Sequence, residues 1–350
     1  MNFSFDKLRS IGVQKLGLGI LCVILALVLI VMIFATAFIH DMIGNVSANG
    51  GDHIDGTLSS SELDDIRGQE TLPPDYTGAT VDPSDVTIPT VPNQVIDNPD
   101  VINIMLVGQD RRPGQGRQRS DSMILCSFNT KTHSLSMISF LRDTYVSIPG
   151  FWPDKMNAAY AYGGMKTLTA TLAANFGVHL DGCVEVDFGG FTNIIDKLGG
   201  VDITLTQKEA DWLNNEQGYS LTAGLNRLNG EQALNYSRIR KLDADAKRAE
   251  RQRKVINSII NSYKNQNPVA MLTLTREILA SGWISTNMSG DEIIDYVTDL
   301  FPLLSDSKIS SHQIPINGTW DDVKALGNIV DLKVITDMQA NRDLLQQLLG

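Results

Sequence analysis

The feature that most constrains this chain is an uninterrupted apolar run near its N-terminus. Residues 16–39 form a stretch of 24 residues in which Thr36 alone is polar. A helix of that length rises roughly 36 Å, which exceeds the roughly 30 Å hydrocarbon thickness of a bilayer. Three basic residues precede the run and Asp41 follows it. By the positive-inside rule we therefore expect residues 1–15 in the cytoplasm, one transmembrane helix at 16–39 and the rest of the chain outside the cell.

The alternative is a signal peptide that is removed after export. The apolar run is longer than the usual core of a signal peptide, and no A-x-A cleavage pattern follows it. An uncleaved single-pass anchor in the cell membrane is therefore the favoured interpretation.

The next segment, residues 40–100, is strongly acidic. Twelve Asp and Glu residues stand there against a single base, Arg67, and six prolines accompany a single aromatic residue, Tyr76. Such a composition buries too little apolar area to offset chain entropy, so we expect a solvated extracellular spacer. Residues 101–350, the expected catalytic domain, carry a net charge of only −2, so a local basic site there would not be swamped.

The overall composition excludes several classes of protein. Apolar residues make up 43% of the sequence, which excludes a disordered chain and a collagen-like repeat. The net charge of −11 argues against nucleic-acid binding through bulk charge. Cys126 and Cys183 could form a bridge, but we interpret both as small buried residues.

Three short apolar runs open the domain, at 102–108, 122–128 and 135–141. The turn-like residues between the last two predict a meander of three antiparallel strands. In that topology the end of the first strand, the start of the second and the end of the third lie at one edge of the sheet. The charged residues at these points are Asp110, Arg119, Asp121, Arg142 and Asp143.

Two carboxylates near each other, without His or Cys beside them, suit a hard cation that prefers oxygen ligands. Asp110 and Asp121 could hold Mg²⁺, or Mn²⁺ in its place, together with phosphate oxygens of a substrate. The alternative is a pair of solvated carboxylates on a loop, and the spacing does not decide between the two.

Helical and strand-like patches alternate further along the chain. Residues 167–176 have the pattern of a helix, and residues 183–188 alternate apolar and acidic side chains as a strand does. Four apolar residues then recur at helical spacing, and their face belongs either to the core or to a lipid-binding pocket. This order predicts an α/β or α+β sandwich whose central, mostly antiparallel or mixed sheet is flanked by helices. The four apolar residues are Phe191, Ile194, Ile195 and Leu198.

Positive charge is densest at residues 238–254, where eight of 17 residues are basic. If residues 236–240 are extended, Arg238 and Arg240 share one face, and a helix from about residue 244 places Arg248 and Gln252 one turn apart. Three interpretations compete: a solvated basic helix, a nucleic-acid surface and a site for a pyrophosphate or phosphodiester. The expected location outside the cell and the lack of stacking aromatics disfavour nucleic acid, and the carboxylates upstream favour the third.

Several motifs occur in an order similar to that of the LytR–CpsA–Psr family, and they fall within residues 101–262. One departure from the family pattern is Leu141, which stands before Arg142 where proline is usual. The arginine-rich loop at 111–118 and the acidic spacer also differ. The motifs are VGQD (107–110), RSD (119–121), ISFLRDTYVSIPG (138–150), KMNAAYAYGG (155–164), FGGFTNIIDKLGGVD (188–202), LNGEQALNYSRIRK (228–241) and RAERQ (248–252).

The resemblance implies a membrane-anchored enzyme, usually of a Gram-positive bacterium. Such an enzyme moves a glycopolymer, such as teichoic acid or capsule, from a polyprenyl-pyrophosphate carrier to peptidoglycan. Asp121, Asp110, Arg238 and Arg240 would then carry the catalysis, with one of the two aspartates as general base. The resemblance assigns Mg²⁺ to Asp110 and Asp121, the pyrophosphate to Arg119, Arg142, Arg238, Arg240, Arg248 and Gln252, and part of a lipid pocket to Phe188, Phe191, Ile194, Ile195 and Leu198.

Two other functions remain open. The first is a membrane-anchored transcriptional attenuator or regulator, a role that the family name historically suggests. The second is a phosphohydrolase that cleaves the lipid-linked pyrophosphate with water as the acceptor.

Overall fold

The computed structural model describes residues 58–67, 76–89, 94–109, 111, 116–242, 245–264, 268–289, 292, 296, 303, 307–325 and 331–350. The expected cytoplasmic segment, the expected transmembrane helix at 16–39 and much of the expected spacer lie outside these residues. Among the helices within the described ranges, none is both long enough and apolar enough to cross a bilayer.

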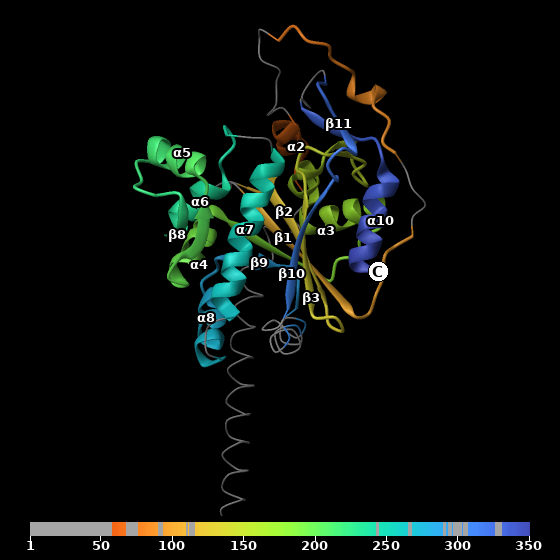
Figure 1. Ribbon diagram of the computed structural model, residues 1–350. Helices are drawn as coiled ribbons and strands as arrows, with labels where there is room; N and C mark the ends of the chain where they lie inside the picture. Colours follow the sequence, from red (N-terminus) through yellow and green to blue (C-terminus); the bar gives the residue numbers. More distant parts are fainter. Residues whose placement is uncertain are drawn as a thin grey trace, which may run out of the picture.

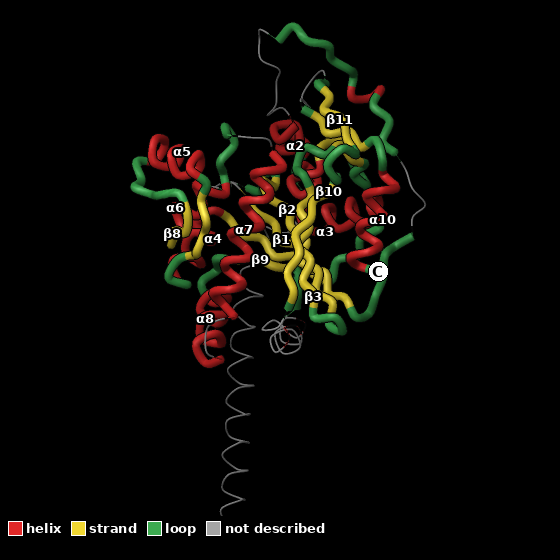
Figure 2. Tube along the Cα trace, in the orientation of Figure 1, coloured by secondary structure: helices red, strands yellow, loops and turns green. Residues whose placement is uncertain are grey.

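A six-stranded mixed sheet forms the centre of the fold (Figures 1 and 2). The first three strands pair antiparallel in succession, which confirms the expected meander. The pairs β1–β6 and β3–β10 are parallel, so the sheet is mixed. The order is β10-β3-β2-β1-β6-β9, formed by β1 (Val101–Gln109), β2 (Ser120–Asn129), β3 (Ser134–Phe140), β6 (Gly182–Asp187), β9 (Ile284–Thr286) and β10 (Lys308–Ile314).

Helices cover both faces of this sheet (Figure 1). On one face lie α3 (Met156–Phe176) and α10 (Met338–Leu349), which contact each other and β2. On the other face α7 (Asp245–Lys264) contacts β2, β3 and β10, with α4 (Phe188–Lys197) and α6 (Gly230–Ser237) beside it. The fold is therefore of the expected class, a mixed α/β structure with a central sheet flanked by helices.

Smaller elements complete the described part of the chain. Three two-stranded sheets are formed by β4–β5, β7–β8 and β11–β12. These elements are α2 (Ser60–Arg67), η1 (Pro83–Asp85), β4 (Tyr145–Val146), β5 (Asp154–Lys155), β7 (Val201–Leu205), α5 (Gln207–Gln217), β8 (Gly224–Leu228), α8 (Pro268–Ala280), β11 (Trp320–Val323) and β12 (Leu332–Ile335).

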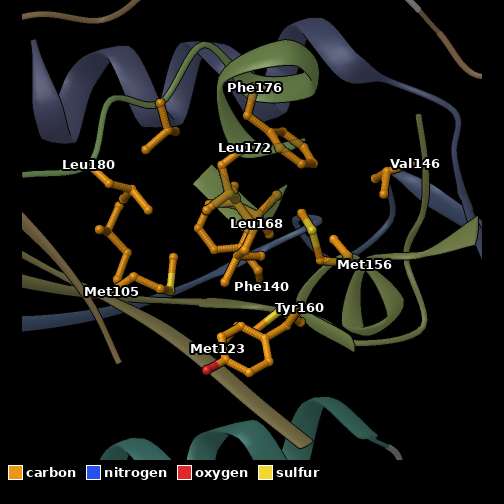
Figure 3. Packing of buried hydrophobic residues seen from close by; sticks show 14 of the residues in the cluster. Met105, Met123, Phe140, Val146, Met156, Tyr160, Leu168, Leu172, Phe176 and Leu180 are labelled. Carbon is orange, nitrogen blue, oxygen red and sulfur yellow. The ribbon is translucent and has the colours of Figure 1, made fainter. Parts of the chain in front are cut away.

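The main core lies between the sheet and α3 (Figure 3). Along β1 alternate residues are buried, so Met105 and Val107 point toward Leu168 and Phe176 of α3, while Leu106 points to the opposite face. Each fully buried apolar side chain of this size stabilises the fold by roughly 1.5–3 kcal/mol. The alternation also leaves a second, partly apolar sheet face under α4 and α7.

A second core joins the elements over that second face. It contains Ile195 of α4, Val201 of β7, Leu213 of α5, Tyr236 of α6 and Val255 of α7, all completely buried. This cluster fixes α4, α6 and α7 relative to one another, and these are the helices that carry the expected arginine and lipid-pocket residues.

The expectation of an extended segment at 236–240 is wrong, because α6 runs to Ser237 and Arg238 is its C-cap. Asn229 accepts a hydrogen bond from the backbone N–H of Gln232, whose side chain accepts one from the backbone of Asn229. This capping box starts the helix. The spacing Asn229–Gln232 is visible in the sequence and would have predicted it.

Neither of the two described cysteines forms a disulfide. Cys183 is buried, as expected, whereas Cys126 on β2 is half-buried. Burial raises the pKa of the Cys126 thiol to about 12, so this thiol is uncharged at neutral pH.

Candidate active site

An elongated cavity of about 740 Å³ lies between the second face of the sheet and helices α4, α6 and α7. Apolar side chains from β1, β6, α4, α7 and β9 form most of its wall, among them Leu106, Val184, Ile256 and Ile284. Charged and polar side chains also line it, among them Asp121, Asp187, Arg238, Arg240, Arg248 and Gln252. The cavity therefore joins an apolar wall to a strongly basic set of residues.

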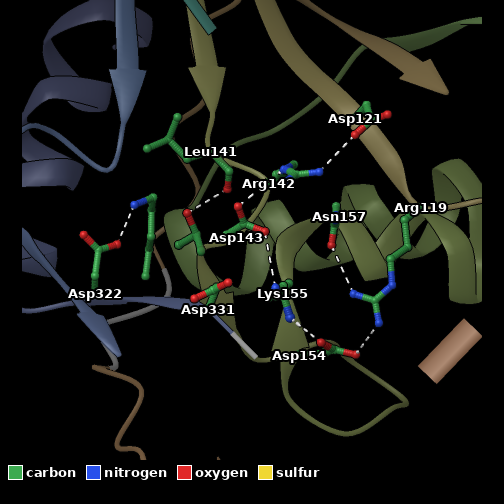
Figure 4. Close-up of polar contacts among 12 residues, drawn as sticks. Arg119, Asp121, Leu141, Arg142, Asp143, Asp154, Lys155, Asn157, Asp322 and Asp331 are labelled. Carbon is green, nitrogen blue, oxygen red and sulfur yellow. Dashed lines mark hydrogen bonds and ion pairs between the residues drawn. The ribbon is translucent and has the colours of Figure 1, made fainter. Parts of the chain in front are cut away.

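Asp121 connects two arginines, of which Arg240 lines the cavity and Arg142 does not. Its Oδ1 accepts hydrogen bonds from Arg142 Nη1 at 3.1 Å and from Arg240 Nη2 at 3.0 Å (Figure 4 shows the Arg142 bond). Arg142 also contacts Asp143 through Nε at 3.4 Å. The carboxylate thus holds two guanidiniums that arise from the end of β3 and the loop after α6.

A β-bulge aims the Asp121 side chain. Gly108 of β1 pairs with Ser122, but the next residue, Gln109, pairs with Ser120, so Asp121 has no partner in the register. Such a bulge inserts one extra residue, bends the strand and redirects the neighbouring side chains. The aspartate therefore reaches the cavity at the place where β2 begins.

Arg238 and Arg248 approach the cavity from different helices. The guanidinium carbon of Arg238 lies 4.4 Å from the centre of the Phe188 ring, a cation–π contact that fixes its direction. Arg248 is only 4% exposed, and Gln252 follows it one helical turn later on the cavity side of α7. The arginines from α6, α7 and the loop between them converge on the cavity, as the sequence predicted. The first of these elements is a helix, however, and not a strand.

Arg119 does not line the cavity. Its guanidinium lies among α3 and β5, with Nη1 3.4 Å from Oδ1 of Asn157 and Nη2 3.6 Å from Oδ2 of Asp154 (Figure 4). Because of the bulge at Asp121, residues 119 and 121 do not share a face as they would in a regular strand.

The expected lipid-pocket residues divide into two groups. Phe188, Phe191 and Ile194 line the cavity. Ile195 and Leu198 are absent from its wall; Ile195 is completely buried in the second core and Leu198 is 8% exposed. Adjacent residues on a helix differ by about 100° in direction, so α4 serves both the cavity and the core.

This combination of fold, motifs and arginine-lined apolar cavity agrees with a family comparison. The model of the LytR_cpsA_psr family matches residues 75–341. The chain belongs to the LytR_cpsA_psr family. The resemblance of the motifs is thereby confirmed.

Curated relatives in this family carry two kinds of name. Regulatory protein MsrR of Staphylococcus aureus is 33% identical over 261 residues, which is 73% of this chain and 77% of MsrR. The polyisoprenyl-teichoic acid–peptidoglycan teichoic acid transferase TagU of Bacillus licheniformis is 34% identical over 227 residues, which is 64% of this chain and 71% of TagU.

A solved structure of the family shows a bound lipid. TagT with bound octaprenyl pyrophosphate lipid superimposes with a TM-score of 0.56 at 26% identity, covering 78% of this chain and all of that one. The family therefore includes a transferase of teichoic acid and a protein that binds a polyprenyl pyrophosphate.

Of the two aspartates expected to bind a metal ion, the structure describes Asp121. Asp121 is a hard oxygen donor of the kind that Mg²⁺ prefers. Asp110 lies outside the described residues. Within the described ranges no three His, Cys, Asp or Glu side chains are arranged to hold a metal ion. Magnesium at Asp110 and Asp121 therefore stays a prediction.

Arg117, which belongs to the arginine-rich segment that departs from the family pattern, is hydrogen-bonded to α3. α3 is broken at Gly163 and Gly164, where φ is −146° and +66°. Arg117, 5% exposed, donates from Nε to the carbonyl of Ala161 at 3.1 Å and from Nη2 to that of Tyr162 at 3.3 Å. The two carbonyls lie next to the break in the helix. The guanidinium therefore supplies hydrogen bonds to them in place of the backbone N–H groups of a continuous helix.

A buried network that the sequence did not single out lies beside the loop. Arg111 Nη2 is 3.2 Å from Oε1 of Glu185 and 3.7 Å from Oδ2 of Asp187, which lines the cavity. Tyr160 of α3 donates to Glu185 Oε2 at 2.5 Å. Burial, followed by the Glu185 charge, raises the pKa of Tyr160, so its hydroxyl stays protonated. The sequence signal for this network was the presence of two acidic residues, Glu185 and Asp187, within the predicted strand at 183–188.

Proposed function

We propose that this protein is a phosphotransferase that moves a glycopolymer from a polyprenyl-pyrophosphate carrier to peptidoglycan. The single observation that carries this proposal is the cavity itself, in which an apolar wall and a set of arginines around Asp121 occur together. A lipid-linked pyrophosphate has the same two parts, an apolar chain and a compact, highly charged headgroup.

The apolar wall suits a polyprenyl chain. Phe191, Ile194, Ile256 and Ile284 supply a surface whose burial against isoprene units contributes about 25 cal/mol per Å². A chain anchored in the membrane, as residues 16–39 predict, would hold this cavity near its lipid substrate.

The basic residues suit the pyrophosphate. Arg238, Arg240 and Arg248 present planar donors that bind phosphate oxygens, and their charge opposes the charge that develops on the departing polyprenyl phosphate. The attacking group would be a hydroxyl of the peptidoglycan, which forms a new bond to the phosphorus that carries the glycopolymer. The bond to the bridging oxygen breaks, and the polyprenyl phosphate leaves.

Asp121 has two roles available in this scheme. Its Oδ1 positions Arg142 and Arg240, while Oδ2 is left to accept the proton of the attacking hydroxyl. Mg²⁺ or Mn²⁺ bound by Asp121 and Asp110 would supply further positive charge beside the pyrophosphate.

The test is transfer by the full-length protein in detergent, with a polyprenyl-pyrophosphate-linked saccharide as donor and peptidoglycan as acceptor. Arg238→Ala should lose transfer while keeping the melting temperature. Arg227→Ala is the matched control, because Arg227 pairs with exposed Asp202 away from the cavity. Transfer by Arg238→Ala at the wild-type rate would show that the proposal is wrong. Release of the saccharide into water at the same rate with and without peptidoglycan would identify a phosphohydrolase instead.

The name of MsrR supports a second candidate, a membrane-anchored regulator. A reporter fused after residue 350 distinguishes the two by topology. Activity of an extracellular reporter supports the transferase, whereas a reporter active only in the cytoplasm supports the regulator.

A further inference from the structure

A second cleft, of about 330 Å³, lies on the opposite side of α7. Arg248 and Gln252 of this helix line the large cavity, whereas Glu250 and Arg253 line the cleft, together with residues of β10 and α10. The two sets occupy roughly opposite faces because each residue turns the helix by about 100°. Figure 1 shows α7 crossing the sheet beside β10, the edge strand.

Arg253 is the central charged group of this cleft. It is 7% exposed, and its Nη1 donates to Ser139 Oγ of β3 at 2.7 Å. Its Nε is buried without a hydrogen-bond partner, and no hydrogen bond of Nη2 occurs in the described part of the chain. A buried charged donor without a partner is costly, so an anion in the cleft would stabilise it.

The nearby acid does not fill this role. Glu250 is held by Lys247 Nζ at 2.8 Å from Oε2 and by Lys254 Nζ at 2.9 Å from Oε1. These two bonds lower the pKa of Glu250 to about 2, so it is ionised, with both oxygens engaged. Glu250 acts on Arg253 through its charge, but no hydrogen bond joins the two side chains in the described part of the chain, so the unbonded donors of Arg253 are left to an external group.

Apart from Lys247, the rest of the wall is uncharged and mixes apolar residues (Ala246, Ile316 and Leu344) with polar ones (Ser311, His312, Gln313 and Asn317). Gln313 Nε2 donates to Asn317 Oδ1 at 2.8 Å and to the carbonyl of Pro315 at 3.2 Å, and no hydrogen bond of Gln313 Oε1 or Asn317 Nδ2 occurs among the described residues. Burial, and then the Arg253 charge, lower the pKa of His312, which leaves its ring uncharged at neutral pH. Amides and neutral rings of this kind bind sugar hydroxyls.

We propose that the cleft between α7 and β10 binds an oxyanion carried by a saccharide, with Nη2 of Arg253 on the anion and the Gln313–Asn317 pair on sugar hydroxyls. The anion is either a phosphate ester or a carboxylate. At about 330 Å³ the cleft is within the usual range of small-molecule sites. The proposal is independent of the transfer reaction, because the cleft shares no lining residue with the large cavity.

The experiment is a titration of the full-length protein in detergent, followed through the Nε–H resonance of Arg253 by NMR. The probes are glucose 1-phosphate, N-acetylmuramic acid and inorganic phosphate, and Arg253→Lys assigns the resonance by removing it. We expect a saturable shift with at least one of the two organic probes, with a dissociation constant of about 1 mM or below, as for a small site with few contacts. A shift with glucose 1-phosphate identifies a phosphate ester, and a shift with N-acetylmuramic acid identifies a carboxylate.

Three variants separate this cleft from other sites. Arg248→Gln disables an arginine of the large cavity and should leave the shift intact. Lys241→Gln, which removes an exposed charge that lines neither the cleft nor the large cavity, should also leave it intact. Asn317→Ala should weaken the organic probe about three- to tenfold through the loss of one hydrogen bond, without weakening inorganic phosphate.

The outcomes that overturn the proposal are equally direct. No shift with either organic probe at about 50 mM, far above the affinity expected of a real site, would exclude the site. Loss of the shift in Arg248→Gln would place the anion in the large cavity. Inorganic phosphate binding as tightly as both organic probes, or no effect of Asn317→Ala, would exclude the saccharide.

Discussion

Arg240 donates from Nη2 to Oδ1 of Asp121 at 3.0 Å, although 119 positions separate the two residues in the chain. The same oxygen accepts a bond from Arg142. A cluster of guanidiniums repels itself, and a shared carboxylate offsets part of that repulsion. The bulged aspartate at the start of β2 therefore organises the basic part of the cavity, and the first prediction concerns it.

Asp121→Asn should lower transfer at least about 100-fold, because a neutral amide no longer orders Arg142 and Arg240 by charge and is a poor base. The free energy of unfolding should change by less than about 1 kcal/mol, since the ion pairs are partly exposed. Transfer assays and urea denaturation measure the two effects. Asp202→Asn, at the exposed pair with Arg227, is the control and should change neither. Wild-type transfer by Asp121→Asn would contradict this role.

The contact between Arg238 and Phe188 should be measurable as a coupling energy. Phe188→Leu keeps an apolar side chain but removes the ring that lies 4.4 Å from the guanidinium. A double-mutant cycle with Arg238→Met, using the dissociation constant of a polyprenyl pyrophosphate, should give a coupling of about 0.5–2 kcal/mol. Additive effects of the two substitutions would show that the ring does not position the arginine.

Ile194 and Ile195 are neighbours with different surroundings and form a matched pair. Ile195→Ala should lower the free energy of unfolding by about 2–5 kcal/mol, because it leaves a hole in the second core. Ile194→Ala should cost less stability and should weaken lipid binding, because Ile194 lines the cavity. Thermal denaturation measures the loss of stability, and lipid titration measures the loss of binding. A larger loss of stability in Ile194→Ala, or a larger loss of lipid binding in Ile195→Ala, would contradict the assignment of Ile194 to the cavity and Ile195 to the core.

The buried pair of Glu209 and Arg251 predicts acid sensitivity. Arg251 Nε is 2.8 Å from Glu209 Oε1, with the side chains 4% and 8% exposed. Burial alone would raise the pKa of Glu209, but hydrogen bonds from Thr206 and Arg251 outweigh it and lower the pKa below its ordinary value of 4.5. Because the pKa is lower in the folded state, ionised Glu209 stabilises the fold at pH values above its ordinary pKa. This stabilisation is lost as the pH falls through the folded-state pKa.

Glu209→Gln should therefore destabilise the protein at pH 7 by about 3 kcal/mol, the scale for removing one partner of a buried pair. Its melting temperature should also fall less steeply than that of the wild type below pH 4.5. Glu216→Gln, at an exposed contact with Lys241, should follow the wild-type curve. Parallel curves for Glu209→Gln and the wild type would contradict the role of this carboxylate.

The sequence by itself determined the early strands and several residues of the candidate site. Short apolar runs and the turn-like residues between two of them predicted a meander, and reversal of the chain brings Asp121 and Arg142 to one edge. Spacing on a helix placed Arg248 and Gln252 on one side of α7. These inferences depend on periodicities of two and 3.6 residues, which are properties of the local backbone.

The tertiary structure decided the rest. The bulge at Asp121 separates it from Arg119, and it arises from the register between β1 and β2, which the β2 sequence alone does not contain. Likewise, Ile194 lines the cavity and Ile195 enters the core because of where α4 lies against β7, α5 and α6. Local sequence sets which residues share a face, but only the packing of distant segments sets what that face meets.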